Sequence, residues 1–218
     1  MNQDWSELNK TMQAQIRKKD TYLDGISSLF ELRNGLMQTI LSFRDHLSRE
    51  DYSAIPFINA DGYHSKTIAY SLWHIFRIED IVAHTLINGD EQIFFSGNYQ
   101  ERIHSPIITT GNELVKQDIS DFSKQLEIDE LHAYISEVKE STEAMLRDLP
   151  YEMLKQKILP ERREILQKMN VVSSDENAVW LIDYWCGKDV RGLIQMPFSR
   201  HWIMHIEASL RIEKKIRK

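Results

Sequence analysis

The chain has 218 residues, with 27 Lys and Arg residues against 33 Asp and Glu residues, which gives a formal net charge of −6 at pH 7. Hydrophobic residues make up 42% and charged residues 28%, a composition typical of soluble globular proteins. This length favours a single domain over residues 1–218. An acidic chain is poorly suited to binding the phosphate backbone of a nucleic acid, so no nucleic-acid partner is expected.

Three further features bear on where the protein is found. No apolar run approaches the ~18 residues needed to cross a bilayer, so no membrane partner is expected. The residues from Met1 to Glu7 lack both the basic and the apolar region of a secretory signal. Cys186 is the only cysteine, which excludes an intramolecular disulfide. Together these features predict a cytoplasmic protein.

The composition favours helices over strands. Only 8 Gly and 5 Pro occur, so turns are sparse and the elements are expected to be long. Leu, Ile, Met, Glu and Lys are plentiful, whereas Val-rich alternating runs are missing. We therefore expect an all-α fold with four main helices.

The first main helix is expected from Thr21 to Leu47, after a shorter leading helix or a loose arm over residues 1–19. Its apolar residues recur at spacings of three and four, as a helical stripe does: Leu29, Leu32, Leu36, Ile40, Phe43 and Leu47. The second helix is expected from Ser65 to Gly89, where the glycine suits a C-terminal cap. It is apolar on most sides, which is typical of a helix buried by several neighbours.

Two extended connections separate the remaining helices. Residues 90–127 are expected to be irregular, and the third helix to run over residues 129–149. In the second connection, over residues 150–198, the sequence from Ser173 to Glu176 matches a capping box and predicts a short helix ending at Trp185. The last helix is expected to start near Ser199 and to run to the end of the chain, where basic residues suit the negative end of the helix dipole.

One pair among the eight histidines stands out, because His201 and His205 lie four residues apart. On a helix this spacing places both imidazoles on one face, with Cβ atoms ~5–6 Å apart, so both can reach one ion at ~2.0–2.1 Å. Chance alone gives roughly 0.26 such pairs in this sequence. The pair continues a stripe of apolar residues toward the core, at Ala208, Ile212 and Ile216. Two adjacent imidazoles in a core lose hydration, and a shared cation would compensate. The alternative is a hydrogen-bonded pair without an ion.

His74 is the best third ligand, because it lies within the apolar second helix and facing helices of a bundle direct ligands to a common point. Its alternative is an ordinary buried histidine bonded to a carbonyl. His84 is ten residues further on and does not share its helix face, so we place it near the polar end of the helix. The other histidines are expected in or beside loops, with His132 on an exposed helix face.

These motifs resemble the DinB-like superfamily, whose name refers to DNA-damage induction. The resemblance is carried by the segment Leu72–Asp80, LWHIFRIED, on the second helix and by His201-x-x-x-His205 on the last helix. It implies a four-helix bundle in which His74, His201 and His205 bind a divalent metal. It covers roughly residues 21–90, 128–149 and 199–217, whereas the two connections exceed the usual length. Members of this superfamily often pair, so the resemblance also implies a homodimer.

Three neutral imidazoles leave one coordination position open, as in a catalytic site. Nitrogen ligands suit zinc, with nickel, iron or copper as alternatives. A water bound there would have its pKa lowered toward ~7, and a thiolate could bind instead. The resemblance implies a hydrolase or a thiol-dependent S-transferase or isomerase, acting on a small molecule with a low-molecular-weight thiol. The alternative is a non-catalytic, stress-linked helical interaction module without a functional metal.

Each of the other residues near these histidines has either a functional or a structural interpretation. Cys186 is either a thiolate that acts at the site or, more commonly for a lone cysteine, a small buried hydrophobe. The charged residues after His74, namely Arg77, Glu79 and Asp80, either include a carboxylate that orients a ligand histidine or form an internal ion pair. The tryptophans either line a pocket or pack in the core: Trp73, Trp185 and Trp202.

Overall fold

The computed structural model describes residues 2–218, apart from the side chain of Tyr63. Five helices hold most of the helical residues: α1 (Gln3–Gln15), α2 (Tyr22–His46), α4 (Ile68–Asp80), α8 (Ile128–Asp148) and α12 (His201–Ile216). Shorter helices lie in the connections: α3 (Arg49–Ser53), α5 (Ile93–Ser96), α6 (Tyr99–Arg102), α7 (Gln117–Gln125), α9 (Pro160–Lys168), α10 (Trp180–Cys186) and α11 (Val190–Gln195). No strand occurs in residues 2–218, where a single isolated bridge pairs Lys157 with Asp189. The predicted all-α class is confirmed.

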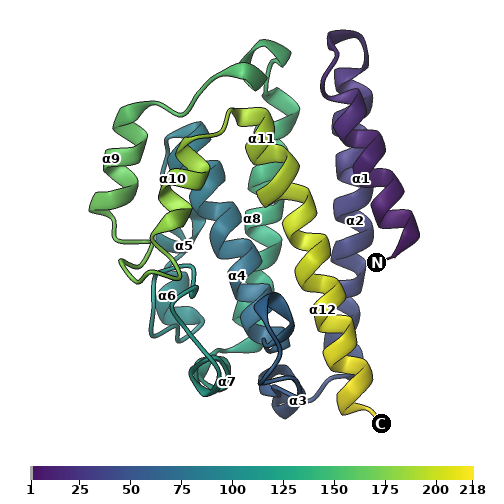
Figure 1. The fold of residues 1–218 in the computed structure, drawn as a ribbon, viewed down its shortest axis with the longest axis vertical. Helices are drawn as coiled ribbons and strands as arrows, with labels where there is room; N and C mark the ends of the chain where they lie inside the picture. Colours follow the sequence, from purple (N-terminus) through teal and green to yellow (C-terminus); the bar gives the residue numbers. More distant parts are fainter. Residues whose placement is uncertain (1) are drawn as a thin grey trace.

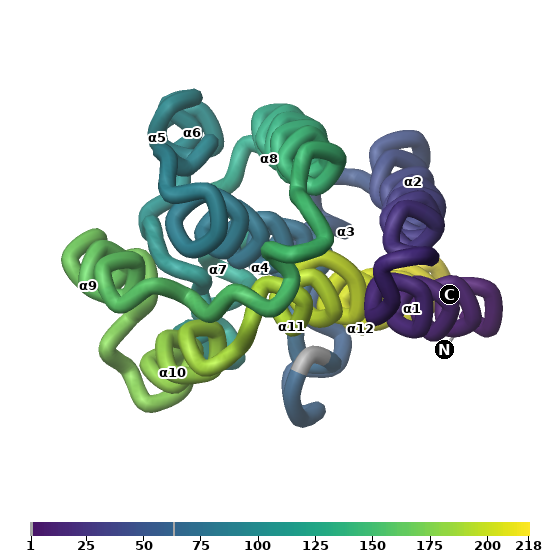
Figure 2. Tube along the Cα trace, turned by 90° about the horizontal axis from the view of Figure 1, so that it is seen from above, coloured from purple at the N-terminus to yellow at the C-terminus, as the bar shows by residue number. Residues whose placement is uncertain are grey.

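Four long helices enclose the interior. α4 contacts α8 and α12, and α2 contacts the same two helices, so the contacts close a ring. The side view and the end-on view agree on this four-sided arrangement, with α1 packed along α2 (Figures 1 and 2). None of the helices among the described residues combines the length and the apolar character needed to cross a membrane.

The expected helix ends are largely correct. α2 begins one residue after Thr21 and ends one before Leu47. α8 matches the predicted third helix within one residue, and residues 1–19 contain the helix α1 rather than a loose arm. A π-helical segment over Ile81–Asn88 continues α4, and Gly89 ends it. Gly89 has a φ of 78°, the left-handed conformation expected of a glycine cap.

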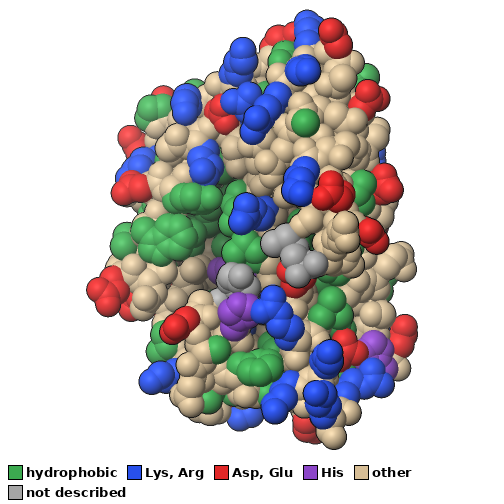
Figure 3. All heavy atoms as spheres, turned by 45° about the vertical axis from the view of Figure 1, so that its right-hand side comes forward, with side chains coloured by type: hydrophobic (Ala, Val, Ile, Leu, Met, Phe, Trp, Pro, Cys, Tyr) green, Lys and Arg blue, Asp and Glu red, His purple; other side chains and the backbone are tan. Residues whose placement is uncertain are grey.

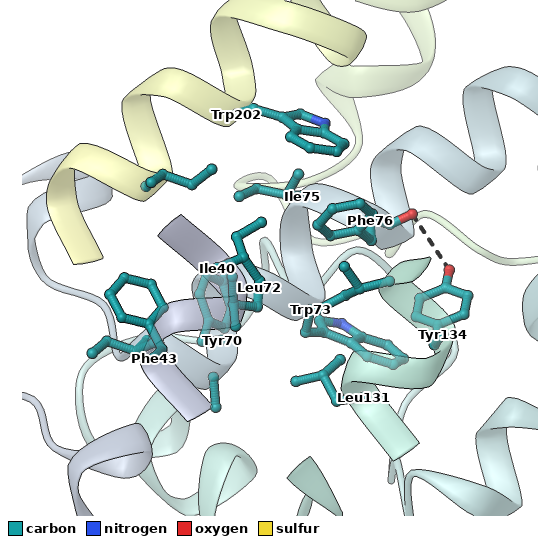
Figure 4. Close-up of a cluster of buried hydrophobic side chains, with 14 of the residues drawn as sticks. Ile40, Phe43, Tyr70, Leu72, Trp73, Ile75, Phe76, Leu131, Tyr134 and Trp202 are labelled. Atoms are coloured by element: carbon teal, nitrogen blue, oxygen red, sulfur yellow. Dashed lines mark hydrogen bonds between the residues drawn. The ribbon is translucent and has the colours of Figure 1, made fainter. Parts of the chain in front are cut away.

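Every residue of α4 is buried, as expected for a helix that is apolar on most sides. Figure 4 shows how its side chains point to different neighbours, with Phe76 toward Trp202 of α12 and Trp73 toward Leu131 of α8. The Phe76 and Trp202 ring centroids are 4.5 Å apart. A helix surrounded in this way holds its polar residues in fixed surroundings, and His74 is one of them.

The core also contains a buried network of charges centred on Arg33. This side chain, fully buried, donates hydrogen bonds to Glu79 at 2.8 and 2.9 Å and to Glu143 at 3.0 Å. Its guanidinium lies 4.3 Å from the centre of the Trp202 ring, and the Trp202 indole donates to Glu79 at 2.7 Å. The network ties α2, α8 and α12 to α4, so it fixes the helix that carries His74.

The connection over residues 90–127 is anchored to α4 by two further charged residues. The Asp80 carboxylate accepts the backbone N–H groups of Ile93 and Phe94, both at 2.9 Å. The Arg77 Nε atom donates to the carbonyl of Ile108 at 3.0 Å. The segment expected to be irregular therefore follows a defined path along α4.

One expectation for the second connection is wrong. Ser173 and Glu176 form no capping box: the Ser173 hydroxyl accepts the N–H of Asp175 at 3.2 Å, and the helix α10 begins only at Trp180. The serine stabilises a local turn instead, an alternative open to this residue type. The last helix begins at His201, close to the expected Ser199, and a π-helical turn over Met196–Arg200 joins it directly to α11.

Candidate metal centre

The structure brings together the three histidines that the sequence selected. His74 comes from α4, and His201 and His205 come from successive turns of α12. The ring centroid of His74 lies 5.0 Å from that of His201 and 4.9 Å from that of His205, and the centroids of His201 and His205 are 4.6 Å apart. One nitrogen of each ring lies within 4.8 Å of the other two. The three imidazoles therefore converge on one point.

Backbone contacts fix the orientation of His74. Its Nδ1 atom lies 2.7 Å from the carbonyl oxygen of Thr110, a hydrogen bond that requires the proton on Nδ1 and leaves the lone pair of Nε2 available. The Tyr70 ring stacks on the imidazole with centroids 5.4 Å apart. A carbonyl that accepts the second ring N–H is the usual partner of a metal-ligating histidine. The carboxylates after His74 do not have this role: Glu79 forms an ion pair with Arg33, and Asp80 forms one with Arg77.

Burial keeps all three imidazoles in the neutral form that metal coordination requires. Loss of hydration lowers the pKa of His74 to about 4. It also lowers the pKa of His201 and His205 well below the ordinary value, and the proximity of the other imidazoles lowers both further. Close packing of three such rings has an unfavourable desolvation free energy, which a shared cation would offset.

The donor set fits a divalent metal ion. Ligand nitrogens at 2.0–2.1 Å from a tetrahedral ion are about 3.4 Å apart, which lies inside the 4.8 Å limit within which these nitrogens fall. The Nδ1 atom of His201 is buried and has no hydrogen-bond partner among the described residues, an uncommon state that a missing ion commonly explains. Three nitrogen ligands are compatible with zinc, nickel, iron or copper.

A cavity of about 660 Å³ leads from the surface to the three histidines. It is lined by parts of α4 and α12 and by the loops around residues 58–66 and 112–116. Figure 3 shows this face as a hollow in which histidine side chains lie beside hydrophobic ones, with Lys and Arg side chains on the surface around it. The centre is therefore accessible to small molecules from the surface.

Two other histidines lie away from this centre in unexpected surroundings. His84 does not share the face of His74, as expected, but it is buried and bonds to Asp90 at 2.7 Å and to Ser141 at 3.1 Å. His132 is 2% exposed and its Nε2 atom lies 3.0 Å from the Tyr52 hydroxyl. The prediction that His132 faces solvent is wrong, because α3 covers that face of α8.

We expect the burial of His132 to make folding stability depend on pH. Burial lowers its pKa to about 4, whereas an unfolded histidine titrates near 6.5. The unfolded chain therefore binds more protons between these values, and stability falls as the pH drops below about 6.5. At pH 5 the loss from this residue is at most about 2 kcal/mol. Urea unfolding at pH 7 and pH 5 measures it.

The matched variants are His132→Gln, which keeps a hydrogen-bonding partner for Tyr52, and His104→Gln at an exposed position. The first should lose part of the difference between pH 7 and pH 5, and the second should keep it. Equal pH dependence in His132→Gln and the native protein would show that His132 is not buried in the neutral form.

The remaining sequence candidates fall into clear classes. Cys186 lies outside the three-histidine group, and burial raises the pKa of its thiol, which disfavours the reactive thiolate. Trp73 and Trp202 are core residues, whereas Trp185 lines a small apolar side pocket that includes His74 and His201. Residues that the sequence did not single out also line the main cavity: Lys66, Tyr70, Asn112, Lys116 and Trp180.

Comparison with known proteins does not assign the chain to a family. No protein-family model matches it, and no curated protein matches it significantly. The resemblance to the DinB-like superfamily and the homodimer that it implies therefore remain predictions, supported only by the motifs and by what the geometry contributes.

Proposed function

We propose that the protein is a metal-dependent enzyme that acts on a small molecule at the three-histidine centre. The observation that carries this proposal is the convergence of His74, His201 and His205 at the end of an accessible cavity. A divalent ion held by these three imidazoles would have a coordination position left for a ligand, and it would supply Lewis-acid chemistry that lowers the pKa of a bound water or thiol. We propose zinc as the ion, with nickel or iron as the other candidates.

The protein's own groups have separate tasks in this proposal. His201 and His205 hold the ion from one helix face, and His74 closes the set from the opposite helix. The Thr110 carbonyl keeps His74 in the tautomer that presents Nε2 to the ion. The packed helices exclude bulk water from all sides except the cavity, so polar interactions at the centre are stronger than in solution.

We further propose that the chain is a DinB-like four-helix bundle. The ring of contacts among α2, α4, α8 and α12 supports this, as does the placement of one ligand on α4 and two on α12. The reaction is then either hydrolysis or a thiol-dependent S-transfer or isomerisation. Each of these needs the open coordination position and an entrance for the substrate.

Metal analysis of protein purified without an affinity tag tests the proposal. We expect about one divalent ion per chain, and none in the triple variant with His74, His201 and His205 replaced by Ala. Anomalous scattering from crystals of the native protein would identify the element and its ligands. A metal-free native protein that is fully folded and does not take up added zinc would contradict the proposal and favour the non-catalytic interaction module.

A further inference from the structure

Lys66 is a cation at the entrance to the three-histidine centre without a carboxylate partner. Its Nζ atom lies 4.9 Å from the centre of the Tyr70 ring, and Tyr70 in turn stacks on His74. No carboxylate among the described residues forms an ion pair with Lys66. Partial burial lowers the pKa of this ammonium group, because it loses hydration without gaining a counter-ion. A bound anion would supply the missing partner.

The cavity lining contains a second lysine. Lys116 also lines the cavity and, like Lys66, has no carboxylate partner among the described residues. Asp61 is the one acidic residue of the lining, and both Asp61 and Lys116 are exposed. The lining therefore carries a net positive formal charge, which a divalent ion at the histidines would increase. Such a cavity attracts anions and repels cations.

A smaller, apolar pocket adjoins the main cavity beside His74 and His201. It has a volume of about 80 Å³ and shares His74, His201 and Trp180 with the main cavity. Its other walls are mostly apolar, and they include Trp185 and Leu181. This volume is smaller than the ~150 Å³ of an engineered cavity that accepts benzene, so it suits a short alkyl group.

We propose that the cavity binds an organic anion with a short apolar tail, with its charged group at Lys66 and Lys116 and its tail in the pocket beside Trp180 and Trp185. The atoms between the two ends then face the three histidines. This inference rests on the proposed function only for the chemistry that follows binding, since recognition of the anion involves groups outside the metal ligand set.

Binding of hexanoate, hexan-1-ol and acetate to the zinc-loaded protein tests this inference. In a ¹H–¹⁵N chemical-shift titration, we expect hexanoate to bind at least tenfold more tightly than the other two. Hexan-1-ol lacks the charge, and acetate lacks the tail, for which each buried methylene contributes about twofold to fourfold. The indole N–H signals of Trp180 and Trp185 should shift with hexanoate and not with acetate. Equal affinities for hexanoate and hexan-1-ol would overturn the proposal.

Variants of Lys66 separate recognition by the lysine from direct binding to the metal. Lys66→Met should weaken hexanoate binding at least tenfold and change hexan-1-ol binding less than twofold, whereas Lys66→Arg should keep hexanoate affinity within about threefold. Lys168→Met removes a lysine that is 79% exposed on α9 and should have no effect. If Lys66→Met binds hexanoate as the native protein does, the metal alone holds the carboxylate and the proposal is wrong.

Two further measurements keep the test decisive. If Lys66→Met does not fold, the test uses Lys116→Met, which should also weaken hexanoate binding, and the affinities of the native protein for the three ligands. Zinc content is measured in the same samples. Protein that binds hexanoate but no zinc would contradict the metal centre and leave the anion site standing. Protein that binds one zinc ion without distinguishing hexanoate from hexan-1-ol would contradict the anion site alone.

Discussion

Replacing His205 with Ala is expected to reduce the zinc content of untagged protein from about one ion per chain to less than a tenth of that. Two imidazoles remain in the variant, and neither can replace the lost ligand because His74 and His201 are fixed on their own helices. Removing an outer partner of a ligand histidine already weakens metal binding 10–100-fold, and removing a ligand itself should weaken it more. Metal content after dialysis against buffer without zinc measures the effect.

The same substitution should have little effect on thermal stability. His205 lines an accessible cavity, so its removal enlarges a space that is already open and leaves no closed void. The hydrophobic clusters that hold the helices together do not include the three histidines, so we expect the fold not to depend on the ion, unlike a structural zinc site whose loss unfolds the chain. His104→Ala, at an exposed position, is the matched control and should retain the zinc. A fall in melting temperature of more than about 8 °C, or ~2–4 kcal/mol for a chain of this size, would identify a structural ion.

Replacing Arg33 with Met is expected to lower the free energy of unfolding by about 3–5 kcal/mol. The variant keeps most of the side-chain volume but leaves the Glu79 carboxylate buried without its partner. Glu79 is fully buried, and it would retain only the Trp202 indole as a donor. An uncompensated charge in a core is among the largest effects of single substitutions. Urea unfolding monitored by circular dichroism measures it.

Two further variants test this cause. The double variant Arg33→Met with Glu79→Met removes both charges, and it should recover more than half of the lost stability, since apolar replacements of buried ion pairs are often neutral. Arg163→Met breaks an exposed pair with Asp183 and should cost less than about 1 kcal/mol. If the double variant is as unstable as the single one, the loss comes from packing rather than from the unpaired carboxylate.

Local sequence patterns predicted the main helices and the three histidines because each depends on spacing within one segment. The stripe from Leu29 to Phe43 becomes the buried face of α2, and the i,i+4 spacing of His201 and His205 places both on one face of α12. The four-helix arrangement then brings His74 to them. Periodicity within helices thus carried enough information for the centre itself.

The surroundings of the centre depend on contacts between distant segments, which no local pattern encodes. Thr110 orients His74 through its backbone carbonyl. Because every residue type has this carbonyl, the identity of residue 110 does not reveal the contact. Lys66 lies at the entrance because the loop before α4 folds back over the cavity. His132 was placed wrongly for the same reason, since the element that covers it, α3, lies some 80 residues earlier in the chain.

The π-helical turn over Met196–Arg200 has a consequence for insertions and deletions. Its widened hydrogen bond, from the N–H of His201 to the carbonyl of Met196, accommodates one more residue than an α-helical turn does. Because the wider winding absorbs this extra residue, deleting one residue here and restoring α-helical winding would leave His201 and His205 on nearly the same side of the helix relative to α11. Deleting one residue between His201 and His205 would instead rotate His205 by about 100° away from the face that it shares with His201. The turn before His201 therefore tolerates a change in length that the segment between the two ligands does not.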